Sequence, residues 1–234
     1  MHNTRADCPG PSTRETLTST SRKLAAVSAG VAVAAALITF YILTYLVVRP
    51  PAVAAAGSAP HVRLTLQTVA SIGFGPHPDW VSYLAKNNQG KWVHSTILKV
   101  PAHSLVTVTL YQYDTATGLR NPYFGGPQGL VGDMTIDGKV VKTLDPDLAS
   151  HTFAIPDLGV SVPLQGVPDK AKNQCSVAPC TLKEAHTTVT FTFRTGKKGT
   201  FRWQCFVPCA AGFILGNGGP MQSLGYMDGY LHVV

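Results

Sequence analysis

Two cysteines and a methionine near the carboxyl end have the residue types and the spacing of soft metal ligands. Cys205, Cys209 and Met221 lie in the stretch FRWQCFVPCAAGFILGNGGPM, residues 201–221, which begins as an alternating strand and continues as a glycine-rich loop. Thiolate and thioether sulfur atoms, combined with imidazole nitrogen, are donors that suit copper. The stretch therefore predicts one edge of a copper site, to which a second strand edge must bring a histidine.

No histidine lies between Cys209 and His232, so this stretch lacks a neighbouring imidazole. A resemblance to the cupredoxin fold implies that the histidine is His151, which begins the segment HTFAIP and matches that family's first ligand. The metal ligands that this resemblance implies are His151, Cys205, Cys209 and Met221. One nitrogen and three sulfur donors form a soft set, so we expect a single copper ion, held preferentially as Cu(I).

Disulfide formation is a second chemistry open to the cysteines. Cys175 and Cys180 flank the short segment SVAP, and this hairpin-like spacing predicts a disulfide that closes a loop. Cys205 and Cys209 would also pair in an oxidising compartment if their Cα atoms came within about 7 Å of each other. In that alternative the domain has no thiolate left for copper, and the sequence leaves both alternatives open.

A long uncharged segment predicts that the chain is anchored in a membrane. Residues 24–48 contain no charged side chain. A helix of this length extends about 37 Å, which is enough to cross an apolar core of roughly 30 Å. The alternative is a signal peptide cleaved near residues 52–57, but the apolar core of such a peptide has only about 7–15 residues. Basic residues gather ahead of the segment, so we expect a cytoplasmic N-terminus and the rest of the chain outside the cell membrane.

These features divide the chain into four predicted parts. Residues 1–23 form a polar, disordered cytoplasmic tail, and residues 24–48 form a single-pass transmembrane helix. Residues 49–61 form a linker rich in Pro, Ala and Gly, and residues 62–234 form one extracytoplasmic domain. The formal net charge is +7, but the basic residues of the external part are scattered singly apart from Lys197-Lys198, which speaks against nucleic acid as a partner.

The external part has the pattern of a series of short strands separated by turn residues. The predicted strands are residues 61–70, 91–100, 104–113, 151–164 (a strand pair or one bent strand), 186–193, 199–205 and 225–234. The strands at 186–193 and 199–205 are expected to form one strand–turn–strand unit, and long loops are expected at 114–147 and 165–185. With 22 Gly and 17 Pro available for turns, the pattern predicts an all-β Greek-key sandwich or barrel.

The order of these segments resembles the cupredoxin fold. The segment HTFAIP, a T-x-T-F strand, a G-x-F-x-W-x-C strand, a cysteine-bearing loop and a last strand follow one another. More narrowly, the chain resembles the external domain of subunit II of haem–copper oxidases, in which an H-x-F segment precedes Cys-x3-Cys-x3-His-x2-Met. His151, Cys205 and Cys209 match this motif, whereas Phe213 and Gly216 stand at the positions of the second histidine and of the methionine. In this longer loop, Met221 or Met227 is available as the methionine.

The resemblance implies a function for the external domain. It implies electron transfer or copper binding in a respiratory oxidase-type assembly, with haem–copper oxidase subunits and a cytochrome c-like donor as partners. The chain would then be at most a non-catalytic electron-transfer subunit, because the oxidase chemistry would belong to a partner. Two alternatives remain open: a copper-free structural subunit of such an assembly, and an unrelated β-sandwich that binds other surfaces.

Overall fold

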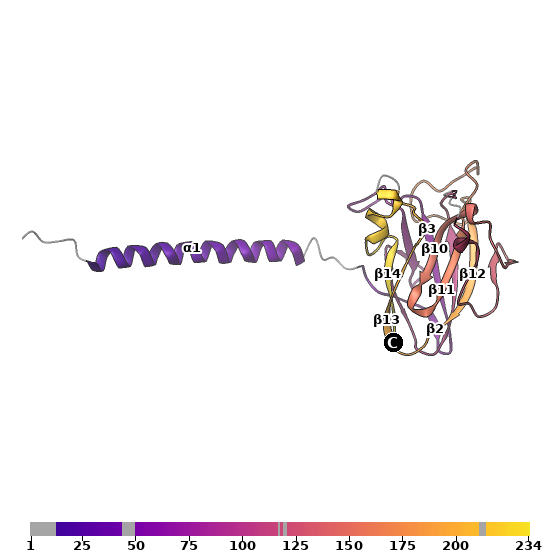
Figure 1. Cartoon of the computed structure of the whole chain (residues 1–234), viewed down its shortest axis with the longest axis horizontal. Helices are drawn as coiled ribbons and strands as arrows, with labels where there is room; N and C mark the ends of the chain where they lie inside the picture. The colour runs from indigo at the N-terminus through magenta and orange to yellow at the C-terminus, as the bar shows by residue number, and fades with distance from the viewer. Residues whose placement is uncertain (1–12, 44–49, 117, 119–120, 211–213) are drawn as a thin grey trace, which may run out of the picture. The chain divides into compact units, whose positions relative to one another are not determined.

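The structure, a computed structural model, describes residues 13–43, 50–116, 118, 121–210 and 214–234 (Figure 1). It divides into two units, Met1–Val48 and Arg49–Val234. The first contains a helix and the second contains all of the strands.

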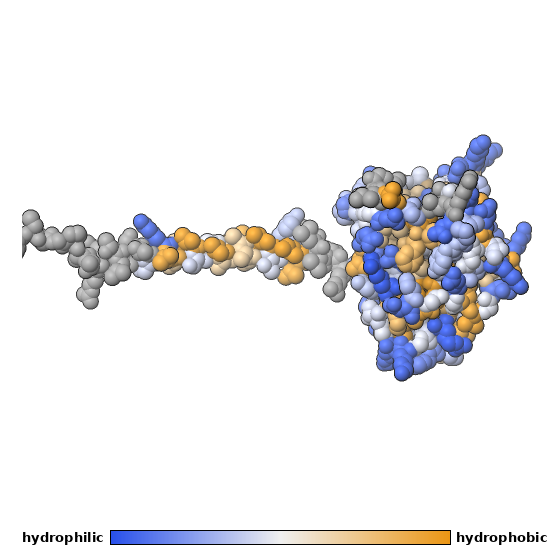
Figure 2. All heavy atoms as spheres, viewed as in Figure 1, coloured by the Kyte–Doolittle hydropathy of each residue, from blue (hydrophilic) through white to orange (hydrophobic). Residues whose placement is uncertain are grey.

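The helix α1 spans Thr13–Tyr41. Its segment Ser21–Tyr41 is long and apolar enough to cross a membrane, a property that a signal sequence near the N-terminus would share. Apolar side chains cover the helix along this segment (Figure 2). The predicted disordered tail is therefore wrong for residues 13–23, because no glycine or proline between Ser12 and Ala29 interrupts the helix ahead of the apolar segment. Residues 1–12 and 44–49 lie outside the described residues.

The second unit is a sandwich of two β-sheets, which confirms the predicted fold class. Sheet A has the strand order β1 (Val53–Ala54), β6 (Ile97–Val100), β14 (Asp228–Val233), β13 (Gly199–Gln204), β10 (Ala149–Ile155) and β11 (Val160–Gln165). Sheet B has the order β5 (Trp92–Val93), β4 (Ser82–Lys86), β3 (His61–Val69), β7 (Leu105–Gln112), β12 (Thr187–Arg194), β8 (Met134–Ile136) and β9 (Lys139–Val141). The short strand β2 (Ala56–Ser58) pairs with β3.

Strict alternation of side chains explains the central pair of sheet B. Along β7, Val106, Val108 and Leu110 are buried in the core, while the residues between them are half-buried on the opposite face. The neighbouring strand β12 repeats this pattern and pairs with β7 over its whole length. One apolar face per sheet, turned toward the other sheet, is what holds a sandwich together.

Aromatic side chains fill the space between the sheets. Trp203, on β13, is completely buried, and its ring centroid lies 4.8 Å from that of Phe153 and 4.9 Å from that of Tyr83. The indole Nε1 donates a hydrogen bond to the carbonyl oxygen of Thr96 at 2.9 Å. Trp203 thus connects both sheets immediately ahead of the cysteine-bearing loop.

Gly229 permits a close approach of backbone beside this tryptophan. A Cβ atom at Gly229 would lie only 2.1 Å from the carbonyl oxygen of Thr96. That same oxygen accepts hydrogen bonds from the side chain of Trp203 and from the backbone N–H of Tyr230. Any side chain at Gly229 would therefore push β14 away from the segment that enters β6.

The predicted linker at residues 49–61 contains two short strands that belong to the sandwich. It contains β1, which pairs in parallel with β6, and β2, which pairs with β3. Val53 is buried in the core, so the sandwich begins well before Val62. The sequence could not indicate this, because an Ala- and Pro-rich composition says nothing about backbone partners at the edge of a distant sheet.

Two predicted strand segments are divided between the sheets. Residues 91–100 form β5 in sheet B and β6 in sheet A. The predicted strand–turn–strand unit is divided in the same way, with β12 in sheet B and β13 in sheet A. The chain therefore crosses the sandwich at Lys197 and Lys198 instead of forming a hairpin there. Strand β4 lies in a segment for which no strand was predicted. The remaining predicted strands occur in the structure, with residues 151–164 as the hairpin of β10 and β11.

Candidate metal centre

Three separate segments bring the four predicted ligands together. His151 lies on β10, Cys205 directly follows β13, Cys209 lies in the loop beyond it, and Met221 lies in the 3₁₀ turn η6, Gly219–Gln222. Strands β10 and β13 are neighbours in sheet A, paired through Ala154 and Gln204. The end of β13 therefore delivers the first thiol beside the histidine strand.

The distances between donor atoms suit a shared ion. Nδ1 of His151 lies 3.8 Å from Sγ of Cys205, which lies 3.8 Å from Sγ of Cys209. Sγ of Cys209 lies 3.2 Å from Sδ of Met221. Two ligands about 2.3 Å from a tetrahedral ion are themselves about 3.8 Å apart, a geometry taken from zinc as a comparable ion. The ligand atoms of His151, Cys205 and Cys209 all lie within 4.8 Å of one another and could share one metal ion, with the sulfur of Met221 beside Cys209.

The cysteines divide into one disulfide and one pair of thiols. Cys175 and Cys180 form the predicted disulfide, with Cα atoms 5.8 Å apart. Cys205 and Cys209 are both free, and their sulfur atoms are too far apart for a covalent bond. The alternative in which both pairs are oxidised is not the state that the structure shows.

Asp114 is a functional residue that the sequence pattern did not reveal. It follows β7, and its carboxylate oxygen Oδ2 lies 3.0 Å from Nε2 of His151. A carboxylate can only accept, so Nε2 carries the hydrogen and donates it, which turns the other ring nitrogen, Nδ1, toward Cys205. A carboxylate behind a metal-binding histidine is a common support of such sites, because it fixes the tautomer and the ring orientation.

The charges of these groups are strongly coupled. Burial disfavours the imidazolium form of His151, but hydrogen bonds with Asp114 and Cys205 outweigh burial and raise its pKa to about 9. Burial alone would raise the pKa of Cys205, but hydrogen bonds from Cys209 and His151 and the charge of His151 lower it well below the ordinary value. The Cys205 thiolate and burial in turn raise the pKa of Cys209. These directions favour a thiolate at Cys205 beside an imidazolium at His151, and a metal ion held here would need both thiols deprotonated and the imidazole neutral.

Backbone groups hold the Cys205 sulfur in position. The N–H of Thr152 donates to Sγ of Cys205 at 3.4 Å, and the N–H of Cys205 donates to the carbonyl oxygen of Met227 at 3.0 Å. The N–H of Phe206 donates to the hydroxyl of Thr152 at 2.8 Å. Since His151 and Cys205 are both completely buried, their positions are set by packing and hydrogen bonds before any metal arrives.

Tyr83 is a second neighbour that the sequence did not indicate. Its hydroxyl donates to the carbonyl oxygen of Thr152 at 2.9 Å. Burial raises the pKa of Tyr83 well above the ordinary value, and the nearby Cys205 and Cys209 raise it further. The phenol thus stays neutral and supports the backbone between His151 and the sulfur atoms.

The Asp114 carboxylate gives a specific prediction. We expect Asp114→Asn to weaken copper binding about 10- to 100-fold, because the amide keeps the shape but loses the charge that orients the imidazole. Asp137→Asn is the matched control, since the Asp137 carboxylate accepts from the N–H of Thr188 and takes no part in the cluster. Competition with a Cu(I) chelator measures both affinities. Equal affinity in the two variants would contradict the positioning role of Asp114.

No other described residues form a comparable centre. Within the described ranges, His151, Cys205 and Cys209 are the only group of three or more His, Cys, Asp or Glu with ligand atoms close enough to share a metal ion. His77 instead stacks on Trp80 at 3.8 Å between ring centroids. Phe213, at the position where the oxidase motif has its second histidine, lies outside the described residues.

The fold is a sandwich of two β-sheets. No protein-family model matches the chain, and no curated protein matches it. Among solved structures, the chain is similar to the copper protein rusticyanin, at 17% identity and a TM-score of 0.34 over 78% of this chain and 82% of rusticyanin. Rusticyanin from Thiobacillus ferrooxidans in a second structure gives 18% identity and a TM-score of 0.34, over 78% and 82% of the two chains.

A further similar structure is the Cu(I)-bound metal-binding domain of the Cu(I)-exporting P-type ATPase CopA from Streptococcus pneumoniae D39. Its identity is 8% and its TM-score 0.36, over 80% of this chain and 99% of that domain. At these values, the similarity does not indicate what this chain binds. The inference about metal depends on the donor atoms of the site.

Proposed function

We propose that this chain is a membrane-anchored copper protein whose external domain binds one copper ion through His151, Cys205, Cys209 and Met221. The observation that carries the proposal is the approach of Nδ1 of His151 and Sγ of Cys205 to 3.8 Å, although the two residues are 54 positions apart in the chain. A set of one nitrogen and three sulfur atoms, buried except for the half-buried Cys209, favours copper among the common metals. Copper bound there would supply reversible one-electron chemistry.

The residues of the chain have separate roles in this proposal. Asp114 orients the imidazole of His151, and Cys205, whose pKa is lowered by Cys209 and His151, would supply a thiolate ligand. Cys209 is half-buried and therefore lies on the more accessible side of the pair. The completely buried side chains of His151 and Cys205 exclude water from the other side. A rigid, dry donor set is suited to holding copper with little rearrangement.

Copper binding to the full-length chain in detergent tests the proposal directly. We expect about one copper ion per chain and intense absorption from thiolate-to-copper charge transfer after oxidation. Failure to retain copper when both thiols are reduced would instead favour a copper-free structural subunit, in which the sandwich serves only as a binding surface.

The two methionines of the loop make a sharper test. Met221 contacts Sγ of Cys209 through its sulfur, whereas Met227 meets the centre through its backbone carbonyl oxygen. Both side chains are buried to a similar degree, so Met221→Leu and Met227→Leu form a matched pair. We expect Met221→Leu to shift the copper absorption and weaken Cu(I) binding about tenfold, and Met227→Leu to do neither. The opposite result would give the ligand role to Met227.

We also propose that the domain transfers electrons or handles copper in a respiratory oxidase-type assembly. The order of His151, Cys205 and Cys209 in the chain supports this, as does an apolar helix ahead of the domain. In this arrangement the N-terminus is cytoplasmic, the domain is outside, and a cytochrome c-like protein is the donor. Purification from the native membrane tests it: haem-containing subunits should accompany the chain. A chain that carries copper but no haem protein would leave copper handling as its function.

A further inference from the structure

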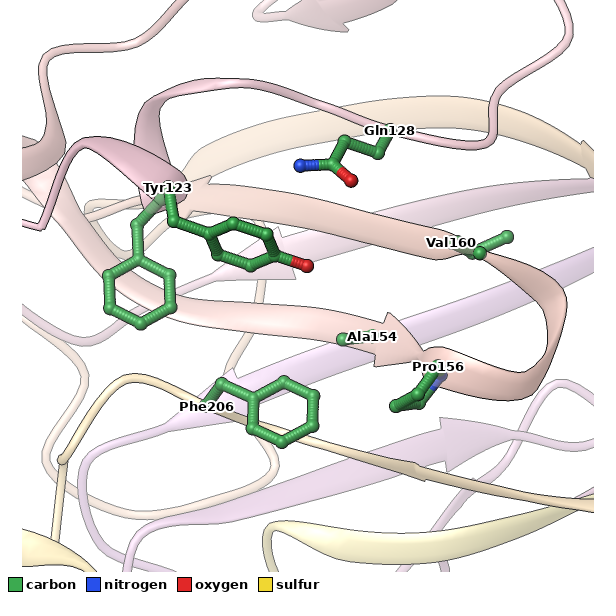
Figure 3. A pocket seen from close by; sticks show the side chains of 8 residues that line it. Tyr123, Gln128, Ala154, Pro156, Val160 and Phe206 are labelled. Carbon is green, nitrogen blue, oxygen red and sulfur yellow. The ribbon is translucent and has the colours of Figure 1, made fainter.

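A pocket with a volume of about 500 Å³ opens beside the candidate metal centre. Its lining includes Tyr123, Phe124, Gln128, Pro156, Val160 and Phe206 (Figure 3). Pockets that hold small organic molecules have volumes of about 300–1,000 Å³ and mostly apolar walls with a few polar groups. The volume of this pocket and its mostly apolar lining are therefore those of a pocket that can hold a small organic molecule.

The backbone around the pocket is held in one arrangement. The N–H of Gln128 donates to the carbonyl oxygen of Ser161 at 2.7 Å, and the N–H of Ser161 donates back to that of Gln128 at 3.2 Å. Gly129 has a φ of +70°, and a Cβ atom there would lie 2.4 Å from the carbonyl oxygen of Gly159. The two loops therefore touch backbone to backbone, and a ligand would enter a pocket that is already formed.

Two polar groups converge over an aromatic wall. The hydroxyl of Tyr123 and the side-chain amide of Gln128 point into the pocket, and the ring of Phe206 lies across from them (Figure 3). Neither polar group forms a hydrogen bond to another side chain or backbone group within the described part of the chain. Aromatic faces favour a ring, and a hydroxyl and an amide favour a partner that both donates and accepts one hydrogen bond.

We infer that this pocket binds a small phenol, with the phenol ring against Phe206 and its hydroxyl between Tyr123 and Gln128. Because Phe206 directly follows Cys205, such a ligand would lie next to the candidate metal centre. The inference depends on the pocket alone and goes beyond the proposed function, since it holds with or without copper.

Calorimetric titration of the full-length chain in lipid nanodiscs with 4-ethylphenol tests this inference, with empty nanodiscs as the baseline. Two comparison compounds separate the interactions: 4-ethylcyclohexanol keeps the hydroxyl but lacks the aromatic face, and 4-ethylanisole keeps the ring but cannot donate. We expect each to bind at least about threefold more weakly than the phenol, the effect of one lost polar or aromatic interaction.

Variants locate the binding site. Tyr123→Phe should weaken binding of 4-ethylphenol about 3- to 10-fold through the lost hydrogen bond, and Phe206→Ala should abolish measurable binding. Tyr111→Phe, in a different pocket, should leave it unchanged. The inference is overturned if 4-ethylphenol does not bind, if the three compounds bind equally, or if Tyr123→Phe and Phe206→Ala have no effect.

Discussion

Replacement of Cys205 by Ser is expected to abolish the thiolate-to-copper absorption and to lower the copper affinity by more than 100-fold. Cys205 is the donor that links the imidazole of His151 to the sulfur of Cys209, each at 3.8 Å. It is also the group whose pKa is lowered well below the ordinary value, so it provides the thiolate that a hydroxyl cannot replace. The loss should therefore exceed the 10- to 100-fold effect expected for a supporting residue.

The control for this prediction removes the two disulfide-bonded cysteines of the domain. A Cys175→Ser, Cys180→Ser double variant loses the loop disulfide but retains both free thiols. Copper stoichiometry and absorption should stay as in the natural chain. If the double variant loses copper while Cys205→Ser retains it, the metal is bound elsewhere and the proposed centre is wrong. Thermal unfolding of both variants shows that each has folded.

The second large effect is expected from Gly229→Ala, which should destabilise the domain by about 3 kcal/mol, at the upper end of the range for overpacked cores. The added Cβ atom would lie 2.1 Å from the carbonyl oxygen and 2.5 Å from Cβ of Thr96, and neither can move without displacing a strand. The hydrogen bond between Trp203 and Thr96 would be strained at the same time. Urea unfolding of the full chain, followed by tryptophan fluorescence, measures the change.

Gly126→Ala is the matched control for this substitution. Gly126 has a φ of −111°, which any residue adopts, and a Cβ atom there meets nothing within 4 Å. Its replacement should change the free energy of unfolding by no more than about 0.5 kcal/mol, as for most open positions. Similar urea midpoints for the two variants would show that β14 and β6 can separate without cost.

The sequence was most informative where a property is local. An uncharged run of 25 residues has the length of a membrane span in whatever fold follows it. The alternation of apolar and polar residues in β7 and β12 follows from the geometry of a strand with one buried face. The loop disulfide could be predicted for the same reason, because Cys175 and Cys180 are only five residues apart.

The metal ligands were also chosen from the sequence, but their meeting point was not. Residue types and a family resemblance selected His151, Cys205, Cys209 and Met221, with Met227 as another methionine available in the loop. Only the folded chain separates the two methionines, because side-chain direction in an irregular loop depends on what packs around it. In the structure the sulfur of Met221, on η6, reaches Cys209.

The supporting residues belong to the tertiary structure alone. Asp114 lies 37 positions from His151 in the chain, and no local pattern joins a carboxylate after one strand to an imidazole on another sheet. The same holds for β1 and β2, for the crossing between β12 and β13, and for the pocket beside Phe206. Strand alternation records which side chains are buried, whereas the choice of partners is made by backbone hydrogen bonds and packing between distant segments.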